Sequence, residues 1–179
     1  MADDPDPDPG RRRFLKIATC GLGAGVGIAL TVPAVGFLVD PAGRRTVTTP
    51  REPIDVGSVD ALPKDGSLVR VQVIAPIVRD AWTAAADVPL GAAWLRRDGD
   101  KVAALSGICP HLGCAIAFDP AAKKFACPCH DSAFAPTGKR ISGPAKRDLD
   151  PLDAKIEKDG RIKLTWVKFK ADTDKREPA

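Results

Sequence analysis

Two short segments, Cys-Pro-His-Leu-Gly-Cys at 109–114 and Cys-Pro-Cys-His at 127–130, hold nearly all the metal-ligand capacity of this 179-residue chain. The chain has only two histidines, His111 and His130, and both lie in these segments with four of the five cysteines. Each segment mixes cysteine with histidine, at C-x-H or C-x-x-H spacing, in a context rich in glycine and proline. The pattern predicts two loops that meet at one metal site.

Two kinds of metal site use two cysteines and two histidines. Structural zinc fingers space a Cys-Cys pair and a His-His pair within a small ββα unit. Here each segment supplies one ligand of each type, and no finger helix follows. In the other kind, a [2Fe–2S] centre, two thiolates hold one iron and two imidazoles hold the other. The mixed ligands favour the iron–sulfur centre, and a structural zinc site remains the alternative.

The two segments resemble the cluster-binding loops of Rieske proteins from cytochrome bc-type quinol oxidoreductases, which have the forms C-x-H-L-G-C and C-P-C-H-G-S. The resemblance implies one [2Fe–2S] cluster. Cys109 and Cys127 would bind the inner iron, and His111 and His130 would bind the outer, solvent-facing iron.

The resemblance also assigns residues around the ligands. The remaining cysteines, Cys114 and Cys129, match the family's loop-to-loop disulfide, which needs an oxidising compartment. The other implied cluster-binding residues are Leu112, Ser132, whose hydroxyl would hydrogen-bond a cluster sulfide, and Gly143 with Pro144, which begin a loop over a third side of the cluster.

Two positions depart from the family pattern. Phe134 stands where the family often has a tyrosine whose hydroxyl donates to a ligand sulfur, and loss of that donor lowers the reduction potential. Asp131 replaces a glycine beside His130. Its negative carboxylate favours the oxidised, more positive cluster, and this also lowers the reduction potential. Glycine adopts a positive φ without strain, and Asp tolerates a positive φ better than most other residues. Whether position 131 keeps such a φ is therefore a question for the structure. We expect a low-potential centre, suited to menaquinol.

The N-terminal region predicts export and membrane attachment. Residues 11–16, Arg-Arg-Arg-Phe-Leu-Lys, resemble the twin-arginine export signal R-R-x-F-L-K. Residues 17–39 carry no charge, and as a helix they span roughly 34 Å, enough for a bilayer core. A cleaved signal peptide is the alternative, but the run is long and no convincing A-x-A site follows it. We expect one retained anchor, with the N-terminus in the cytoplasm and the rest on the periplasmic or outer side of the cytoplasmic membrane.

The predicted fold is all-β. An antiparallel Rieske-type β domain with an inserted cluster-binding subdomain follows one N-terminal transmembrane helix. Alternating apolar residues predict strands at 68–74, 77–79, 93–96, 102–105 and 161–167, with turns at 98–99 and 159–160. The predicted divisions are a cytoplasmic tail with the start of the signal (1–13), the anchor (14–39), a linker or hinge (40–53), the Rieske domain (54–171, cluster subdomain about 107–147) and a polar tail (172–179).

The resemblance implies the redox subunit of a quinol–cytochrome c reductase, a translocase-class enzyme in which this chain is not catalytic alone. His130 would hydrogen-bond the quinol and accept its proton and electron, with His111 sharing the site. The expected partners are a cytochrome b subunit, a c-type cytochrome, a quinol (menaquinol favoured) and membrane lipid. Nucleic acid is not expected, because the 27 basic residues are scattered among 23 acidic ones.

Three other functions remain as alternatives. The small subunit of arsenite oxidase is also an exported Rieske protein, with a molybdenum-containing partner in place of quinol. A soluble Rieske ferredoxin or dioxygenase component would lack the export signal and the cysteines at positions 114 and 129. A membrane-tethered zinc protein without redox activity is the third.

Overall fold

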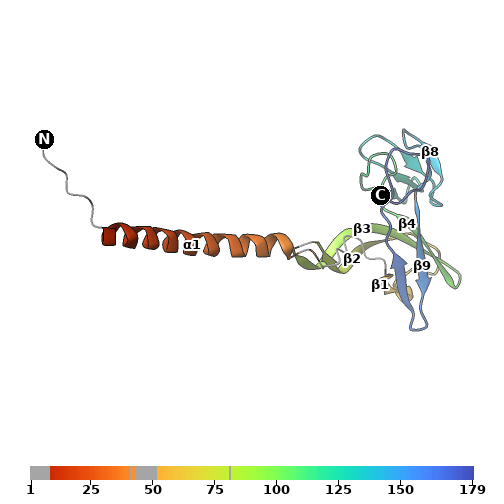
Figure 1. Cartoon of the computed structure of the whole chain (residues 1–179). Coiled ribbons are helices and arrows are strands. Elements are labelled where there is room, and N and C mark those ends of the chain that lie inside the picture. The colour runs from red at the N-terminus through yellow and green to blue at the C-terminus, as the bar shows by residue number, and fades with distance from the viewer. Residues whose placement is uncertain (1–8, 41, 43–51, 81) are drawn as a thin grey trace. The chain divides into compact units, whose positions relative to one another are not determined.

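The computed structural model describes residues 9–40, 42, 52–80 and 82–179, and it divides the chain into two compact units, residues 1–46 and 47–179. Most of the predicted cytoplasmic tail and linker lies outside the described residues. The first unit contains helix α1 (Pro9–Val39), which starts earlier in the chain than the predicted anchor. Figure 1 shows the helix and the β domain of the second unit.

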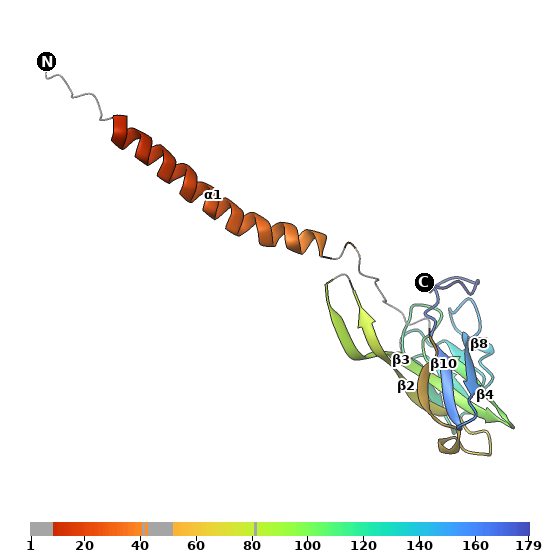
Figure 2. The same cartoon turned by 60° about the horizontal axis from the view of Figure 1, so that its bottom comes forward.

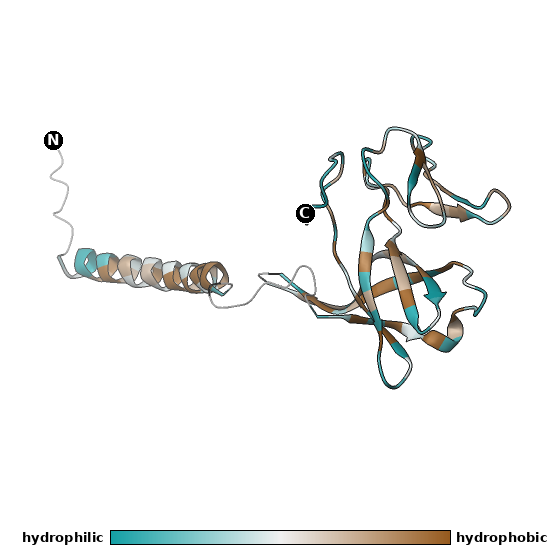
Figure 3. Cartoon of the chain, turned by 90° about the vertical axis from the view of Figure 1, so that its right-hand side faces the viewer, coloured by the Kyte–Doolittle hydropathy of each residue, from teal (hydrophilic) through white to brown (hydrophobic). Residues whose placement is uncertain are grey.

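Helix α1 matches the dimensions and composition of a membrane span. Its 31 residues extend about 46 Å. It is the one helix among the described residues that is long and apolar enough to cross a bilayer. Polar residues gather at its start and apolar residues along the rest (Figure 3). None of its side chains is buried among the residues that the structure describes.

The second unit is built on a six-stranded antiparallel sheet with the order β1-β10-β9-β4-β3-β2. The edge strands β1 and β2 also contact each other, so the sheet curls towards a closed barrel. A short 3₁₀ helix, η1 (Val59–Ala61), follows β1. The strands are β1 (Ile54–Ser58), β2 (Val69–Arg79), β3 (Ala84–Asp98), β4 (Lys101–Ser106), β9 (Pro151–Ile156) and β10 (Arg161–Thr165).

A second, four-stranded antiparallel sheet is inserted between β4 and β9. Its order is β5-β6-β7-β8, and it lies at one end of the domain, near the label β8 in Figure 1. Its strands are β5 (Ala117–Asp119), β6 (Lys124–Ala126), β7 (Ala133–Phe134) and β8 (Arg140–Ser142). The predicted class is therefore confirmed: the fold is mostly antiparallel β, with an inserted subdomain and one N-terminal apolar helix.

Strand β3 separates two hydrophobic cores. Successive side chains of a strand point to opposite faces of its sheet. Ala93 and Leu95 pack in the core of the six-stranded sheet, with Val73, Ile162 and Leu164 among others. Trp94, between them, packs in the core of the inserted subdomain. Residues 92–95 are therefore all buried, and the two sheets share β3 as a common wall.

Strand β2 is longer than either of the two strands predicted for this region. It runs from Val69 to Arg79 and forms with β3 a two-stranded ribbon that projects past the rest of the sheet (Figure 2). The sequence pattern is interrupted at Pro76, which has no N–H for a ladder hydrogen bond. An edge strand such as β2 tolerates this loss, so pairing resumes at Ile77. Strands β1 and β9 were not among the predicted strands.

Candidate metal centre

The first predicted cluster loop connects β4 to β5. It is a tight loop in which the Cys109 N–H donates to the Cys114 carbonyl (2.7 Å) and the Gly113 N–H donates to the Cys109 carbonyl (2.9 Å). Gly113 has φ +82°, a conformation that glycine adopts without strain. The loop leaves Leu112 exposed while it buries Cys109.

The second loop connects β6 to β7. The Cys127 N–H donates to the Ser132 carbonyl (2.9 Å), which closes the loop around Cys129 and His130. Asp131 has φ 55°, so the backbone keeps the left-handed conformation in which the family has glycine. Asp is one of the few side chains that adopt it readily, which explains how the substitution is accommodated.

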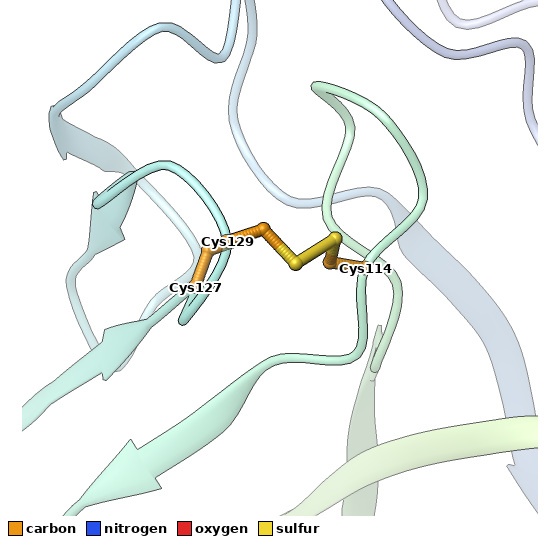
Figure 4. Close-up of side chains that lie close together, drawn as sticks. All are labelled: Cys114, Cys127 and Cys129. Carbon is orange, nitrogen blue, oxygen red and sulfur yellow. A yellow bond between two sulfur atoms is a disulfide. The ribbon is translucent and has the colours of Figure 1, made fainter.

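A disulfide joins Cys114 of the first loop to Cys129 of the second, as the resemblance implied (Figure 4). The sulfur of Cys127 lies within 4.8 Å of both bridge sulfurs. Because Cys114 and Cys129 are oxidised, they cannot act as thiolate ligands, and this cluster of three sulfurs is not itself a metal site. The cysteines that remain free in the two loops are Cys109 and Cys127, and both are buried.

The environment of Cys109 brings four of the predicted site residues together. Burial raises the pKa of the Cys109 thiol above its ordinary value. The His111 backbone N–H donates to its sulfur and opposes that rise in pKa, whereas a hydrogen bond with the Cys127 thiol adds to it. The Ser132 hydroxyl, which is fully buried, also hydrogen-bonds this sulfur. A buried thiol of this kind becomes a stable thiolate when a cation binds it.

The two histidines lie together at the outer side of the loops. Their ring centroids are 4.8 Å apart and their planes are nearly perpendicular. His130 is exposed and His111 is half-buried. The Nδ1 atom of His111 is buried without a hydrogen-bond partner among the described residues. Buried polar atoms are almost always paired, so an unpaired imidazole nitrogen here fits a metal ligand.

These residues fit a [2Fe–2S] cluster of the Rieske type. Two buried thiols lie on the inner side and two imidazoles lie towards solvent, which is the donor set that this cluster requires. The coordination of iron by Cys109, Cys127, His111 and His130 remains a prediction.

A third segment, which follows β8, closes on the second loop. The Ala145 N–H donates to the Ser132 hydroxyl oxygen (3.2 Å). Gly143 has φ +91°, and a Cβ there would lie 2.8 Å from both the Asp131 carbonyl oxygen and the Ser132 nitrogen. Only glycine fits this approach, which brings the Gly143-Pro144 segment against the second loop.

Phe134 lies in the core of the inserted subdomain, where its side chain is fully buried. It packs there with Trp94 and Phe125, and it supplies no hydroxyl donor to the cysteine sulfurs.

The sequence motifs did not indicate three residues that lie near the site. Arg147 and Asp150 form a buried ion pair (2.8 Å) behind the first loop, and the Asp172 N–H donates to the Pro110 carbonyl (3.0 Å). The only local signal was the spacing of an arginine and an aspartate three residues apart, which is common on protein surfaces.

Comparison with known proteins gives matches along most of the chain. The family model for the Rieske [2Fe–2S] domain matches residues 54–153. The menaquinol:cytochrome c reductase iron-sulfur subunit of Bacillus subtilis is 31% identical over 163 residues, which are 89% of this chain and 93% of that protein.

Shorter matches come from related complexes. The cytochrome b6-f complex iron-sulfur subunit of Chlorobaculum tepidum is 47% identical over 64 residues, 36% of this chain and 35% of that protein. The match to this relative therefore spans about a third of its length. Among solved structures, a plasma membrane Rieske protein of Synechocystis PCC 6803 is 27% identical and aligns with 63% of this chain and 99% of its own, at a TM-score of 0.45.

Proposed function

Because the chain belongs to the Rieske [2Fe–2S] family, we propose that it is the iron–sulfur electron-transfer subunit of a cytochrome bc-type quinol:cytochrome c oxidoreductase. The observation that carries the proposal is the site itself. Two buried free cysteines lie behind a pair of histidines, in two loops that a disulfide joins. The chain is one oxidoreductase component of a larger complex and not an enzyme by itself.

The similarities also bear on the alternatives. The relative that matches along most of the chain is named as a subunit of a menaquinol:cytochrome c reductase, so an arsenite oxidase subunit is not supported. The disulfide argues against a soluble Rieske ferredoxin, because such proteins lack this pair of cysteines. The donor set and the family match together favour iron–sulfur over zinc.

We assign Cys109 and Cys127 to the inner iron and His111 and His130 to the outer iron. When bound, the cluster supplies a one-electron acceptor whose charge alters the proton affinity of the imidazoles that hold it. Ser132 donates a hydrogen bond towards the sulfurs, and the Gly143-Pro144 segment covers a third side.

The exposed face of the site is suited to a quinol. His130 can accept a hydrogen bond from a quinol hydroxyl and hold the proton that quinol releases, because its imidazole reaches solvent. Leu112, with 57% of its surface exposed, offers an apolar contact for the quinol ring. The other partners are a cytochrome b subunit, which accepts the second electron of the quinol, and a c-type cytochrome, which receives the electron from this subunit.

We propose menaquinol as the substrate. Phe134 offers no hydroxyl to the ligand sulfurs, and the Asp131 carboxylate lies in the residue next to His130. Both features favour the oxidised cluster and therefore a low midpoint potential. The name of the Bacillus relative supports the same substrate. A redox titration of the purified protein tests this assignment, and a midpoint potential as high as that of tyrosine-containing relatives contradicts it.

We place the protein in the cytoplasmic membrane with a single span, α1. The twin-arginine motif and the basic residues before the span support a cytoplasmic N-terminus. The disulfide supports an oxidising location for the β domain, on the periplasmic or outer side.

The first test is purification of the tagged chain from mildly solubilised native membranes. We expect iron and acid-labile sulfide in equal amounts, with haem b bands in the reduced-minus-oxidised spectrum of the co-purifying proteins. Zinc without sulfide contradicts the cofactor assignment. A cluster that co-purifies with molybdenum and without haem b contradicts the quinol-oxidising complex.

A further inference from the structure

We propose that residues 168–179, the C-terminal strap, hold the first cluster loop in its working conformation, and that Arg147 is the positioning residue that anchors the strap. The inference rests on the proposed function, because it concerns the loop that carries Cys109 and His111. Sequence patterns predicted residues 172–179 as a polar tail. Most strap side chains are exposed, but its backbone is hydrogen-bonded to the domain. The C-terminus lies at the same end of the domain as β8 (Figure 1).

The buried side chain of Arg147 binds the strap. Its Nε and Nη2 atoms donate to the two carboxylate oxygens of Asp150 (both 2.8 Å), and each side chain is only 5% exposed. A buried ion pair is costly unless its remaining donors are satisfied. Two carbonyl oxygens of the strap accept hydrogen bonds from these remaining donors. The Nη1 atom donates to the Thr173 oxygen (2.6 Å), and the Nη2 atom donates to the Lys170 oxygen (2.9 Å).

The strap is folded back on itself, so its backbone is ordered where it meets Arg147. The Lys170 N–H donates to the Glu177 carbonyl (2.9 Å), and the Ala179 N–H donates to the Lys168 carbonyl (2.8 Å). An ion pair between Lys170 and Glu177 (3.1 Å) lies on the same short hairpin.

Asp172 carries the contact with the first loop. Its N–H donates to the Pro110 carbonyl (3.0 Å), and Pro110 lies between Cys109 and His111. The Lys146 ammonium binds the Asp172 carbonyl (3.0 Å) and carboxylate (3.1 Å), which links this point to the segment after Gly143-Pro144.

One peptide unit connects the strap to a ligand sulfur. The carbonyl of the Pro110–His111 peptide accepts from Asp172, and the N–H of the same peptide donates to the Cys109 sulfur. A peptide unit is planar, so a hydrogen bond that fixes its carbonyl also fixes the direction of its N–H. Hydrogen bonds in such a chain polarise and strengthen one another. The strap therefore orients a donor to a ligand sulfur, and donors to sulfur raise the reduction potential.

The same contacts complete a ring around the site. The disulfide joins the first loop to the second, the Ser132–Ala145 hydrogen bond joins the second loop to the third segment, and the strap joins the third segment back to the first loop. The first loop is thus held by the disulfide, by the hydrogen bonds of the Cys109 sulfur with Cys127 and Ser132, and by a link to the strap that depends on Asp172 and Arg147.

The experiment compares two substitutions at one position of the full-length, cluster-loaded protein. Asp172→Pro removes the N–H and cannot adopt the φ of 55° found here. Asp172→Gly removes the same carboxylate but keeps the N–H and suits this φ. The readouts are the midpoint potential, the EPR spectrum of the reduced protein, and hydrogen exchange of the His111 amide.

For Asp172→Pro we expect a lower midpoint potential, a shifted EPR spectrum and exchange of the His111 amide that is faster by about tenfold. Asp172→Gly should match the wild type in all three. Equal effects of the two substitutions would assign the change to the lost Lys146 ion pair and overturn the proposal. Wild-type behaviour of Asp172→Pro overturns it as well.

Arg147→Lys provides a second variant in case Asp172→Pro does not fold. Lysine keeps a cation beside Asp150 but lacks the planar fork that reaches two strap carbonyls at once. We expect changes in the same direction as for Asp172→Pro, and unchanged potential and exchange overturn the proposal. The exposed pair Lys155–Asp153 on β9 provides the control Lys155→Ala. A wild-type protein without iron and sulfide would instead overturn the proposed function.

Discussion

At the residue scale, each loop passes within a few positions from a buried cysteine to residues that reach solvent. Cys109 and Cys127 are buried among aromatic and aliphatic side chains, His111 is half-buried, and His130 is exposed. This gradient suits the proposed electron carrier, because the two cysteines proposed as inner ligands are shielded from water while His130 is open to solvent. The neighbouring residues Phe134, which has no hydroxyl, and Ser132, which has one, decide how many hydroxyl donors the proposed ligand sulfurs receive.

Phe134→Tyr is expected to raise the midpoint potential by about 60 mV, because one hydrogen bond to a charged group contributes about 1.5 kcal/mol and the transfer involves one electron. A redox titration followed by EPR measures the shift. Phe118→Tyr, which adds the same hydroxyl to a partly buried ring of the same core, is the control. An unchanged potential in Phe134→Tyr, or an equal rise in both variants, contradicts the role given to position 134.

Gly143→Ala is expected to destabilise the protein by about 3 kcal/mol, because the positive φ and the collision with the second loop each cost about 1–3 kcal/mol. Chemical unfolding of the full-length protein in detergent measures the loss. Gly99→Ala is the matched control, since Gly99 also has a positive φ (+61°) but open space around its Cβ position. We expect a loss of about 1 kcal/mol there. Equal losses at the two glycines would show that the close approach to Ser132 contributes nothing.

At the scale of the elements, β3 and β10 organise the domain. Strand β3 buries Trp94 on one face and Leu95 on the other, so it joins the core of the six-stranded sheet to the core of the inserted subdomain. Strand β10 pairs with both the edge strand β1 and β9, so it holds β1 in the six-stranded sheet. On the outer face of this edge, Asp55 of β1 lies 2.6 Å from Arg161 and 3.4 Å from Lys163.

Asp55→Asn is expected to remove a pH-dependent part of the stability. The hydrogen bond from Arg161 lowers the pKa of Asp55 from 3.8 to about 2. Because the folded state has the lower pKa, the stabilisation is present above about pH 4 and is lost as the pH falls from 3.8 towards 2. Both side chains are substantially exposed, so we expect a contribution of at most about 1 kcal/mol at pH 7.

Urea unfolding of the wild type and Asp55→Asn between pH 3 and pH 7 measures this contribution. The difference in the free energy of unfolding should shrink as the pH approaches 3. Asp153→Asn, which breaks only the exposed 3.8 Å pair with Lys155, should show little effect at any pH. A difference for Asp55→Asn that stays constant over this range contradicts the assignment.

At the scale of the whole molecule, the two units differ in where their apolar side chains lie. The β domain buries its own apolar residues in two cores, whereas α1 exposes its apolar side chains, among them Leu22, Ile28 and Leu30, along its length. A helix with this surface is stable in a bilayer, where its backbone hydrogen bonds are all internal. The chain therefore combines a helix suited to a membrane with a β domain that has its own hydrophobic cores.

Replacing Arg11 and Arg12 together by lysine is expected to block export, so that the β domain remains in the cytoplasm. There the cysteines at positions 114 and 129 should stay reduced, since the cytosol keeps thiols reduced. Thiol labelling of intact and lysed cells measures both the location and the redox state. Arg13→Lys, at the variable position of the motif, is the control and should behave as the wild type. Export of the double variant contradicts the twin-arginine assignment.

The sequence by itself was sufficient for the features that depend on a few neighbouring residues. The spacing of cysteine and histidine within each loop, the uncharged run at 17–39 and the alternation in β10 predicted the cluster family, the apolar helix and the β class. The disulfide pairing followed from the family resemblance and is confirmed. The assignment of the four ligands, of the quinol contact at His130 and of the domain boundaries remains a prediction.

Only the tertiary structure decided the features that depend on the path of the chain. It showed that Asp131 keeps a positive φ, that pairing in β2 continues past Pro76, and that residues 168–179 return to Arg147 and Pro110. The contacts between the strap and the domain join residues 23 or more positions apart, and they use backbone carbonyls and amides, which nearly every residue type possesses. A side-chain pattern cannot indicate such contacts, because the partners of a backbone group are set by where the fold brings the chain back.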